Sequence, residues 1–598
     1  MELRKSFYIF ILFALILSSI TYAQERRKIV IETAPFFDKD EDKFPDATIL
    51  TRDDMSQVII SHDGIIMWCD QAIYYGKEDF IEAYGNVIIK QGDTITMTSN
   101  YVEYSGITKL AFASGDVVLT EPSSEITTDT LFFDRVKQEA FYKSNGKVVR
   151  DSSTITSVIG RYYMEAKKYQ FVKDVKLVDK DYTINSDQLD FYSETGHAYL
   201  FGPTTIESET STIYCERGFY DTNNDTGYFV KKSRIDYDTR TVEGDSIYFD
   251  RNRSFASATN NIKVTDTINN FVVKGHYAEV FREKDSVFIT KRALAISVQE
   301  NDSIYIHSDT IRVTGPEDHR ITKAFYNAKI YKLDLSGKAD SIHVDHKIGL
   351  TQLINLNRFS SNTAFTTNRN PILWHIDNQI TGDTIHLISN PETEKLDSLK
   401  VFNNAFIISK DTLGDGFNQI KGQKLFGLFK DNELYTIDII KNAESIYYSR
   451  NENNELVGID KSKSGKIKIW ISDSTIDEIR KINRIDGAMY PEEQFPKNDR
   501  ILRGFDWREE ERPLSVEDLF KDDPPLNLPV IKGLENYIPQ EEFFEEALIK
   551  RVKASNKEPE NSNKENKAAR NIPKNKMKRP KEELGTNMKK LNLKKNNN

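Results

Sequence analysis

Apolar and polar residues alternate along most of this chain in short runs. The run Val117-Val118-Leu119 follows a glycine and an acid, and the equivalent run after Asp174 reads Val175-Lys176-Leu177. Alternation with a period of two is typical of a β-strand with one buried and one solvated face. Because lysine takes the middle position in the second run, we expect Val118 and Lys176 to face outward and their neighbours to face inward.

A second pattern, the acid motif, lies between these runs. It reads small residue, acid, any residue, apolar, any residue, apolar, as in Ser186-Asp187-Gln188-Leu189-Asp190-Phe191. Positions at an even spacing of 29 residues are Asp129, Val158, Asp187, Glu216 and Asp245, in which Val158 and Glu216 are degenerate copies. Further copies of the motif contain Asp93, Asp309, Asp340, Asp383 and Glu444. A fixed period of this length indicates a stacked repeat, with at least two short strands in each unit.

Stacked strands of this kind predict an all-β fold in which two sheets, or a flattened tube, enclose an apolar interior. The end strands of such a stack have edges that can accept another strand. The inward apolar positions that we expect to form this interior are Val87, Ile89, Ile95, Met97, Val117, Leu119, Leu131, Phe133, Val175, Leu177, Leu189 and Phe191.

The two ends of the chain differ from the body. Residues 1–23 have two basic residues, an apolar run and small residues before Gln24, as in a cleaved secretory signal peptide. We place the main repeat at 24–345 and a second, weaker β domain at 350–490. Residues 491–553 are rich in proline and acid and are expected to contain one short helix. Residues 554–598, rich in Lys and Asn, are expected to be a disordered, solvated tail.

Several candidate chemical groups are better interpreted as structural. Cys69 and Cys215 lie five repeats apart, too far for a disulfide, and are expected to be free, buried thiols. The evenly spaced acids form a ladder and not a local cluster, so we expect them to cap turns. On a strand, His343 and Asp345 share one face and His346 points to the other, which disfavours a metal site. We therefore expect no metal and no cofactor.

The residues resemble a known family. Tyr84-Gly85-Asn86-Val87 and Ala113-Ser114-Gly115-Asp116-Val117, each followed by an acid motif, are similar to the N-terminal domain of the organic-solvent-tolerance (OstA) family. This family includes the periplasmic lipopolysaccharide carrier LptA and the periplasmic part of LptD. The resemblance implies an elongated, twisted β-jelly roll that is open at its ends, and it makes 350–490 a second OstA-like domain.

The implied function is periplasmic binding and bridging of lipopolysaccharide for outer-membrane assembly, without catalysis. Lipid A acyl chains would lie in the apolar interior, and other Lpt-type components or a second copy would stack on the edge strands. Nucleic acid is not an expected partner, and contact with a membrane would be peripheral at most. Two alternatives stay open: an enzyme acting on polysaccharides through a parallel β-helix, and a purely structural envelope or adhesin repeat.

Overall fold

The computed structural model describes residues 28–150, 152–299, 302–316, 318–356, 370–393, 395–472 and 475–531. All of these residues belong to one compact unit. The expected signal peptide, the helix within 541–552 and the basic tail lie outside the described residues. The boundaries between the two expected β domains stay predictions.

The described chain folds into a single sheet of 36 strands joined by antiparallel pairings. It contains short 3-10 turns but no α-helix among the described residues. The first strands are β1 (Val30–Thr33), β2 (Phe36–Asp38), β3 (Ala47–Thr51), β4 (Val58–His62), β5 (Ile65–Cys69), β6 (Gln71–Tyr75), β7 (Phe80–Gln91), β8 (Ile95–Ser105) and β9 (Leu110–Glu121). Next come β10 (Ser124–Asp134), β11 (Glu139–Tyr142), β12 (Gly146–Arg150), β13 (Ser153–Ser157), β14 (Ile159–Tyr163), β15 (Lys168–Val178), β16 (Tyr182–Tyr192), β17 (His197–Ser208) and β18 (Ser211–Asp221).

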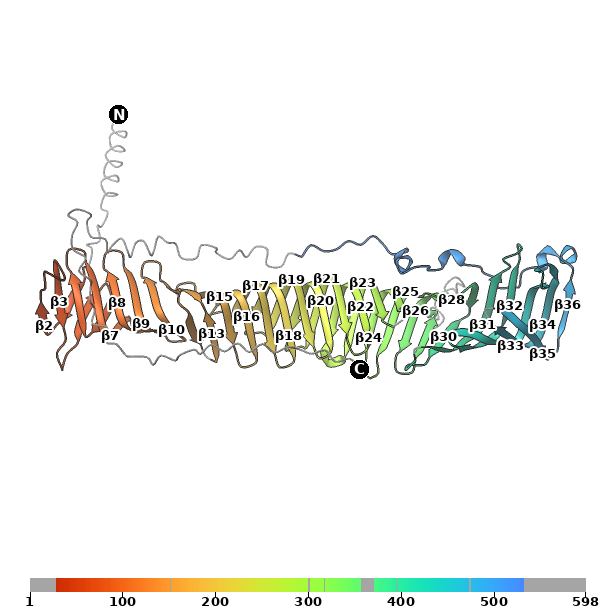
Figure 1. Ribbon diagram of the computed structural model, residues 1–598, viewed down its shortest axis with the longest axis horizontal. Helices are drawn as coiled ribbons and strands as arrows, with labels where there is room; N and C mark the ends of the chain where they lie inside the picture. Colours follow the sequence, from red (N-terminus) through yellow and green to blue (C-terminus); the bar gives the residue numbers. More distant parts are fainter. Residues whose placement is uncertain are drawn as a thin grey trace, which may run out of the picture. The chain divides into compact units, whose positions relative to one another are not determined.

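The strands lie side by side in a row that follows the order of the chain, as Figure 1 shows. The central strands are β19 (Thr226–Tyr237), β20 (Arg240–Asp250), β21 (Phe255–Asp266), β22 (Phe271–Phe281), β23 (Ser286–Ser297), β24 (Ile304–Thr314), β25 (Ile321–Lys332), β26 (Leu335–Asp345) and β27 (Leu350–Ile354). The last are β28 (Ile372–His375), β29 (Asn378–Thr381), β30 (Thr384–Ser389), β31 (Leu396–Lys410), β32 (Phe417–Lys430), β33 (Glu433–Arg450), β34 (Leu456–Ser472), β35 (Thr475–Ile482) and β36 (Asp486–Tyr490). The 3-10 turns are η1 (Arg282–Lys284), η4 (Glu492–Gln494), η5 (Lys497–Asp499), η6 (Glu509–Glu511) and η7 (Glu517–Phe520).

The repeat of 29 residues corresponds to two strands. Strands β16, β18 and β20 begin at residues 182, 211 and 240, and β17, β19 and β21 begin at 197, 226 and 255. Each long strand therefore pairs with the next one along the chain, and each pair of strands adds one repeat. The all-β fold class that the sequence predicts is confirmed.

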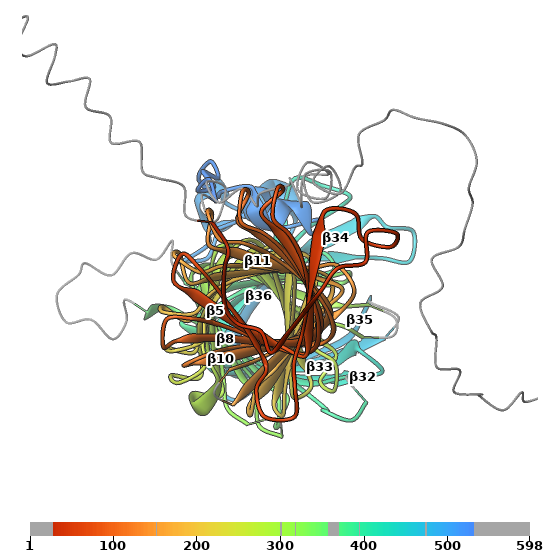
Figure 2. The same cartoon turned by 90° about the vertical axis from the view of Figure 1, so that its left-hand side faces the viewer.

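A bulge bends every second strand near its middle. In β21 the register shifts between Thr259 and Ile262, and both Asn260 and Asn261 have positive φ. Asparagine tolerates this conformation better than most residues, which explains why the runs so often begin with Gly or Asn. The bend divides the sheet into two facing halves, and Figure 2 shows the strands surrounding a common centre.

The acids do not cap turns, so that prediction is wrong for most copies. Asp187, Asp245 and Asp309 lie inside strands β16, β20 and β24, opposite the bulge of the next strand. The Asn261 side-chain amide donates to Asp245 Oδ2 over 2.7 Å, and Asn86 donates to Asp70 in the same way. The acid thus fixes the bulge residue that follows it by 16 positions, which explains why the two motifs interleave.

Candidate functional site

The interior between the two half-sheets is apolar along the row. Among the twelve residues expected there, nine are buried in one continuous cluster: Val87, Met97, Val117, Leu119, Leu131, Val175, Leu177, Leu189 and Phe191. The other three, Ile89, Ile95 and Phe133, are partly buried and pack against that cluster. The alternation predicted their direction because only one face of each strand can be removed from water. Their role in binding lipid stays a prediction.

The turns lie along two edges, which we call lip A and lip B. Lip A holds the turns after odd-numbered strands from β15 to β25, such as 238–239, and lip B holds those after even-numbered strands from β16 to β26, such as 282–285. Half-sheet A lies between the bulges and lip A, and half-sheet B lies between the bulges and lip B. Each half-sheet has an inner face toward the apolar cluster and an outer face.

Polar contacts join the two lips at many places. Arg240 of lip A lies 3.5 Å from Asp285 of lip B, and Arg282 of lip B lies 3.0 Å from Asp238 of lip A. An extended strand of 11 residues spans about 36 Å, so these pairs form only because the strands bend. Equivalent contacts nearer the N-terminus are Lys109 with Asp63, Tyr162 with Glu121, Ser124 with Tyr169, and Gln91 with Gln138.

One slot opens between the lips in the middle of the row, with a volume of about 190 Å³. Apolar side chains from both half-sheets line it: Ile235 and Val242 come from half-sheet A, and Val280 comes from half-sheet B. Thr210, Ser211 and Ser254 add hydroxyl groups to the lining. Arg251 and Arg282 stand at its mouth on lip B. The slot therefore combines an apolar interior with two cations at the entrance.

None of the twelve expected residues lines this slot. They all precede residue 192, whereas the slot is built by later copies of the same repeat, such as Ile235 in β19 and Val242 just before the acid Asp245 in β20. The acid motif at Gly244 marked this region in the sequence. The arginines carried no sequence signal because turn residues vary freely in type.

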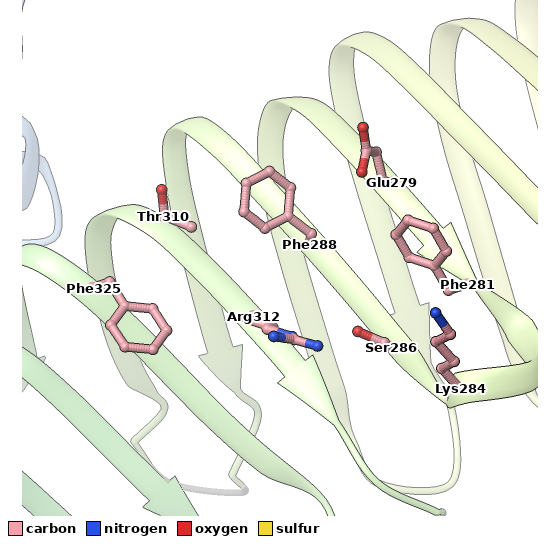
Figure 3. Close-up of a pocket in the computed structure, with 8 residues that line it drawn as sticks. All are labelled: Glu279, Phe281, Lys284, Ser286, Phe288, Thr310, Arg312 and Phe325. Atoms are coloured by element: carbon pink, nitrogen blue, oxygen red, sulfur yellow. The ribbon is translucent and has the colours of Figure 1, made fainter.

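A second depression, of about 390 Å³, lies on the outer face of half-sheet B. Figure 3 shows the rings of Phe281, Phe288 and Phe325 standing out from neighbouring strands, with Arg312 among them. Lys284 of the lip lies 5.7 Å from the centre of the Phe281 ring. These residues were not expected from the sequence, where single outward phenylalanines look like ordinary strand residues.

Residues 491–531, which we call the strap, lie along the outer face of half-sheet A and run back toward the N-terminal strands (Figure 1). The fully buried amides of Gln419 and Gln379 each bind its backbone twice, as a neighbouring strand would, at 2.6–2.8 Å. Lys329 donates to the Leu519 carbonyl, and Asn260 donates to the Pro529 carbonyl. The strap thus reaches from β32 to β21.

The strap covers a second apolar cluster that is separate from the interior. Its Phe495 and Leu502 pack on five buried outer-face residues of β31, β33 and β34, namely Phe406, Ile408, Ile446, Tyr448 and Ile459. Both faces of these strands are therefore apolar, as in sheets that are covered on both sides. The sequence interpretation of 491–553 as a proline- and acid-rich segment with one short helix missed this packing. The sequence signal that could have revealed it is the presence of the large apolar residues Phe495, Leu502 and Trp507 among acids and prolines.

Ion pairs hold the middle of the strap, and they make its docking sensitive to acid. Hydrogen bonds from Arg508 and Lys338 lower the pKa of Glu511 to about 2 from its ordinary value of 4.5. A carboxyl whose pKa is depressed on folding stabilises the fold fully above its unfolded value and loses that contribution as pH falls through its folded value.

We therefore expect Glu511→Gln to lower the urea midpoint most near neutral pH. The gap between wild type and variant should shrink as pH falls from 4.5 toward 2. Urea titrations across this range measure the gap, and Glu510→Gln, which changes an exposed neighbour, is the matched control. A gap that does not change with pH would show that Glu511 is not charged in the docked strap.

The two cysteines are free and buried, as predicted. Burial raises the pKa of both thiols to about 12. His343, Asp345 and His346 make separate contacts, to Ser341, His319 and Thr322 respectively. Within the described ranges, no group of three His, Cys, Asp or Glu residues is placed to hold a metal ion.

A family model matches part of the chain. Residues 26–187 match the family model of the OstA-like protein. This part of the chain is OstA-like. No curated protein matches. Among solved structures, LptH of Pseudomonas aeruginosa, the LptA-homologous periplasmic component of the lipopolysaccharide transport device, is 13% identical, with a TM-score of 0.19 over 22% of this chain and 92% of its own.

The OstA-like match ends at residue 187, but the same strand pattern continues beyond it. Strands β19 to β26 repeat the bulge and the lips that are seen in β15 to β18. The acid recurs in β20, β24 and β26, whereas His276 takes its position in β22. In the part of the chain that the structure describes, no helix is long and apolar enough to cross a membrane.

Proposed function

We propose that this chain is a non-catalytic, Lpt-type carrier and bridge for lipopolysaccharide in the periplasm, which binds lipid A acyl chains between its half-sheets. The observation that carries the proposal is the slot: apolar walls from both half-sheets meet at the lips, and Arg251 and Arg282 stand at its entrance. This arrangement suits an amphiphile with an acidic headgroup. Lipopolysaccharide is the cargo of the transport device to which LptH belongs.

Energetics support acyl binding without any covalent chemistry. Transfer of each methylene from water into an apolar interior contributes about 0.8 kcal/mol, so a single long chain supplies several kcal/mol. Arginine adds charge-assisted hydrogen bonds to a phosphate or carboxylate at the entrance. Directional binding of this kind needs no catalytic group.

The lips must part before a chain can enter, because the interior is already filled by side chains. The lip contacts are suited to this. The side chains of Arg282 and Asp238 are 36% and 59% exposed, and exposed ion pairs of this kind are worth only about 0–1 kcal/mol each. Exposed pairs such as Arg282 with Asp238 therefore contribute little to holding the lips together.

The ends of the row suit contact with other components. Among the described pairings, β2 bonds only to β3, and β36 bonds only to β34. Phe36 and Phe37 of β2 are about three-fifths exposed. A strand from another Lpt-type protein, or from a second copy, would cover both the free backbone groups and the apolar side chains.

The parallel β-helix of the enzyme alternative does not fit the fold. A parallel β-helix needs parallel strand pairing, whereas pairings along this row are antiparallel. The repeated acids Asp70 and Asp245 are engaged with bulge residues. No observation among the described residues favours the structural or adhesin repeat over a carrier.

Locking the lips tests the proposal. In the variant Asp238→Cys/Arg282→Cys, a short bifunctional maleimide will join the lips, while Cys69 and Cys215 stay unreactive because they are buried with raised pKa values. Labelled lipopolysaccharide will then load roughly tenfold less than into the same variant before cross-linking, since entry over one site is blocked.

A matched control joins two positions on a single lip. Lys347 and Asp318 are both on lip B, 3.3 Å apart, so cross-linking Lys347→Cys/Asp318→Cys leaves the lips free to part. Loading of this control should stay normal. Equal loading of the Asp238→Cys/Arg282→Cys variant before and after cross-linking would overturn entry between the lips.

A further inference from the structure

The depression on the outer face of half-sheet B has a composition that the fold alone does not require. Its rings, Phe281, Phe288 and Phe325, come from three different strands, β22, β23 and β25. Thr310 and Ser286 add hydroxyl groups to the same surface. A concave site with aromatic walls and a few convergent polar groups is the usual form of a small-ligand site.

Two cations face each other beside these rings. In the register of β24 and β25, Arg312 lies directly opposite Lys323, and the next residue across on β23 is Phe288. Like charges at opposed positions destabilise a sheet. Among the residues that the structure describes, no acid forms an ion pair with either cation, and Arg312 is exposed. An anion bound between them would remove the repulsion.

The surrounding charges favour this assignment. Lys284, a third cation, approaches the depression from the lip. The one acid in the depression, Glu279, lies two strands from Arg312, about 10 Å away at the usual strand spacing. It accepts a hydrogen bond from Tyr277. The cationic side of the depression is therefore free to receive a negative group.

The depression also adjoins the slot. Three successive residues of β22 and the turn after it connect the two sites. Val280 lines the slot, Phe281 lines the outer depression, and Arg282 lies on the lip between the two. A molecule whose acyl chain lies in the slot emerges at this lip. Its headgroup then lies over the outer aromatic surface.

From this continuity and charge we propose that the outer depression binds the acidic saccharide of the same amphiphile whose acyl chains occupy the interior. Sugar rings present flat C–H faces that pack on aromatic rings, and their hydroxyl groups suit Thr310 and Ser286. Arg312 and Lys323 bind a phosphate or carboxylate on the sugar. This inference rests on the proposed function, because it takes the saccharide to be part of the carried lipid.

The test uses the purified full chain and a lipid-free probe, the saccharide released from lipopolysaccharide by mild acid. Calorimetric titration should show binding that weakens roughly tenfold or more in Arg312→Ala/Lys323→Ala, because two charge-assisted contacts are lost. Phe288→Leu, which keeps apolar area but loses the ring face, should also weaken it. Uncharged dextran should bind no better than background.

The matched control is Lys176→Ala/Lys274→Ala, which removes two exposed cations from the outer face of half-sheet A. It should bind the saccharide as wild type does. Unchanged binding in Arg312→Ala/Lys323→Ala, or an equal loss in the control, would overturn the proposal.

Lipid A without its outer sugars separates this inference from the proposed function. If wild type and Arg312→Ala/Lys323→Ala retain lipid A equally while only saccharide binding falls, both proposals hold. If wild type retains no lipid A but binds the saccharide through Arg312 and Lys323, the carrier proposal fails and the saccharide site stands. If lipid A is retained and the saccharide does not bind, only the site fails.

Discussion

Ending the chain after Tyr490 will destabilise the last part of the row and make it prone to aggregation. The truncation removes the strap and uncovers the apolar outer faces of β31, β33 and β34, including Phe406 and Ile446. Burying Phe495, Leu502 and Leu519 is worth about 1.5–3 kcal/mol for each side chain, so the total loss is several kcal/mol. The buried amides of Gln379 and Gln419 also lose their partners.

Hydrogen exchange measured by mass spectrometry checks this prediction strand by strand. Protection should fall in β31 to β34 and stay close to wild type in β7 to β18, because stacked repeats contact only their neighbours. A chain that ends after Ile531 keeps the strap and is the matched control. Unchanged protection of β31 to β34 in the shorter chain would show that the strap contributes nothing to the fold.

Placing a carboxylate in the interior will destabilise the fold by a comparable amount. Val117 is buried in β9, and Val117→Asp puts an unpaired charge among apolar side chains, which costs about 3–5 kcal/mol. Its neighbour Val118 lies on the outer face, so Val118→Asp should cost less than about 1 kcal/mol. Urea midpoints measure the difference between two adjacent residues of one strand.

The same two positions, 117 and 118, also test whether the interior binds lipid, when each carries the milder substitution to threonine. Val117→Thr keeps the shape of the side chain and adds a hydroxyl, which interrupts the apolar surface at a much smaller cost in stability than a buried charge. We expect it to retain less lipopolysaccharide than Val118→Thr. Equal retention by the two threonine variants would place the lipid outside this part of the interior.

The period and the direction of the side chains could be predicted because they depend on local geometry. A strand that buries one face must alternate, and Val175, Lys176 and Leu177 show that alternation directly. The repeat of 29 residues follows from two strands with their turns. These features need no knowledge of which distant segments meet.

The role of the acids could not be predicted, because it depends on the register between strands. Asp245 looks like a residue that precedes a strand, yet it lies within β20 and binds Asn261 of the next strand. The contacts between the lips could not be predicted for the same reason. Arg240 meets Asp285 only after the strands bend at their bulges, and no spacing in the sequence shows that bend.

The strap was missed for a different reason. Its apolar residues, such as Leu502 and Trp507, are spaced irregularly among acids and prolines, so they show neither a strand period nor a helix period. Only the unusual outer faces of β31 and β33, where Phe406 and Ile446 point away from the interior, require a cover. The outer depression was equally hidden, since Arg312 and Lys323 become opposed only in the folded sheet.

The most direct test of the carrier proposal compares two adjacent positions of β20 in living cells. Val242 lines the slot, whereas Glu243 lies on the outer face, where it pairs with Lys263. A photoreactive amino acid placed at each position in turn, followed by irradiation and blotting for lipopolysaccharide, reports which face meets the lipid. The proposal predicts cross-links from position 242 and none from position 243. Equal cross-linking from both positions, or cross-linking from 243 alone, would contradict it.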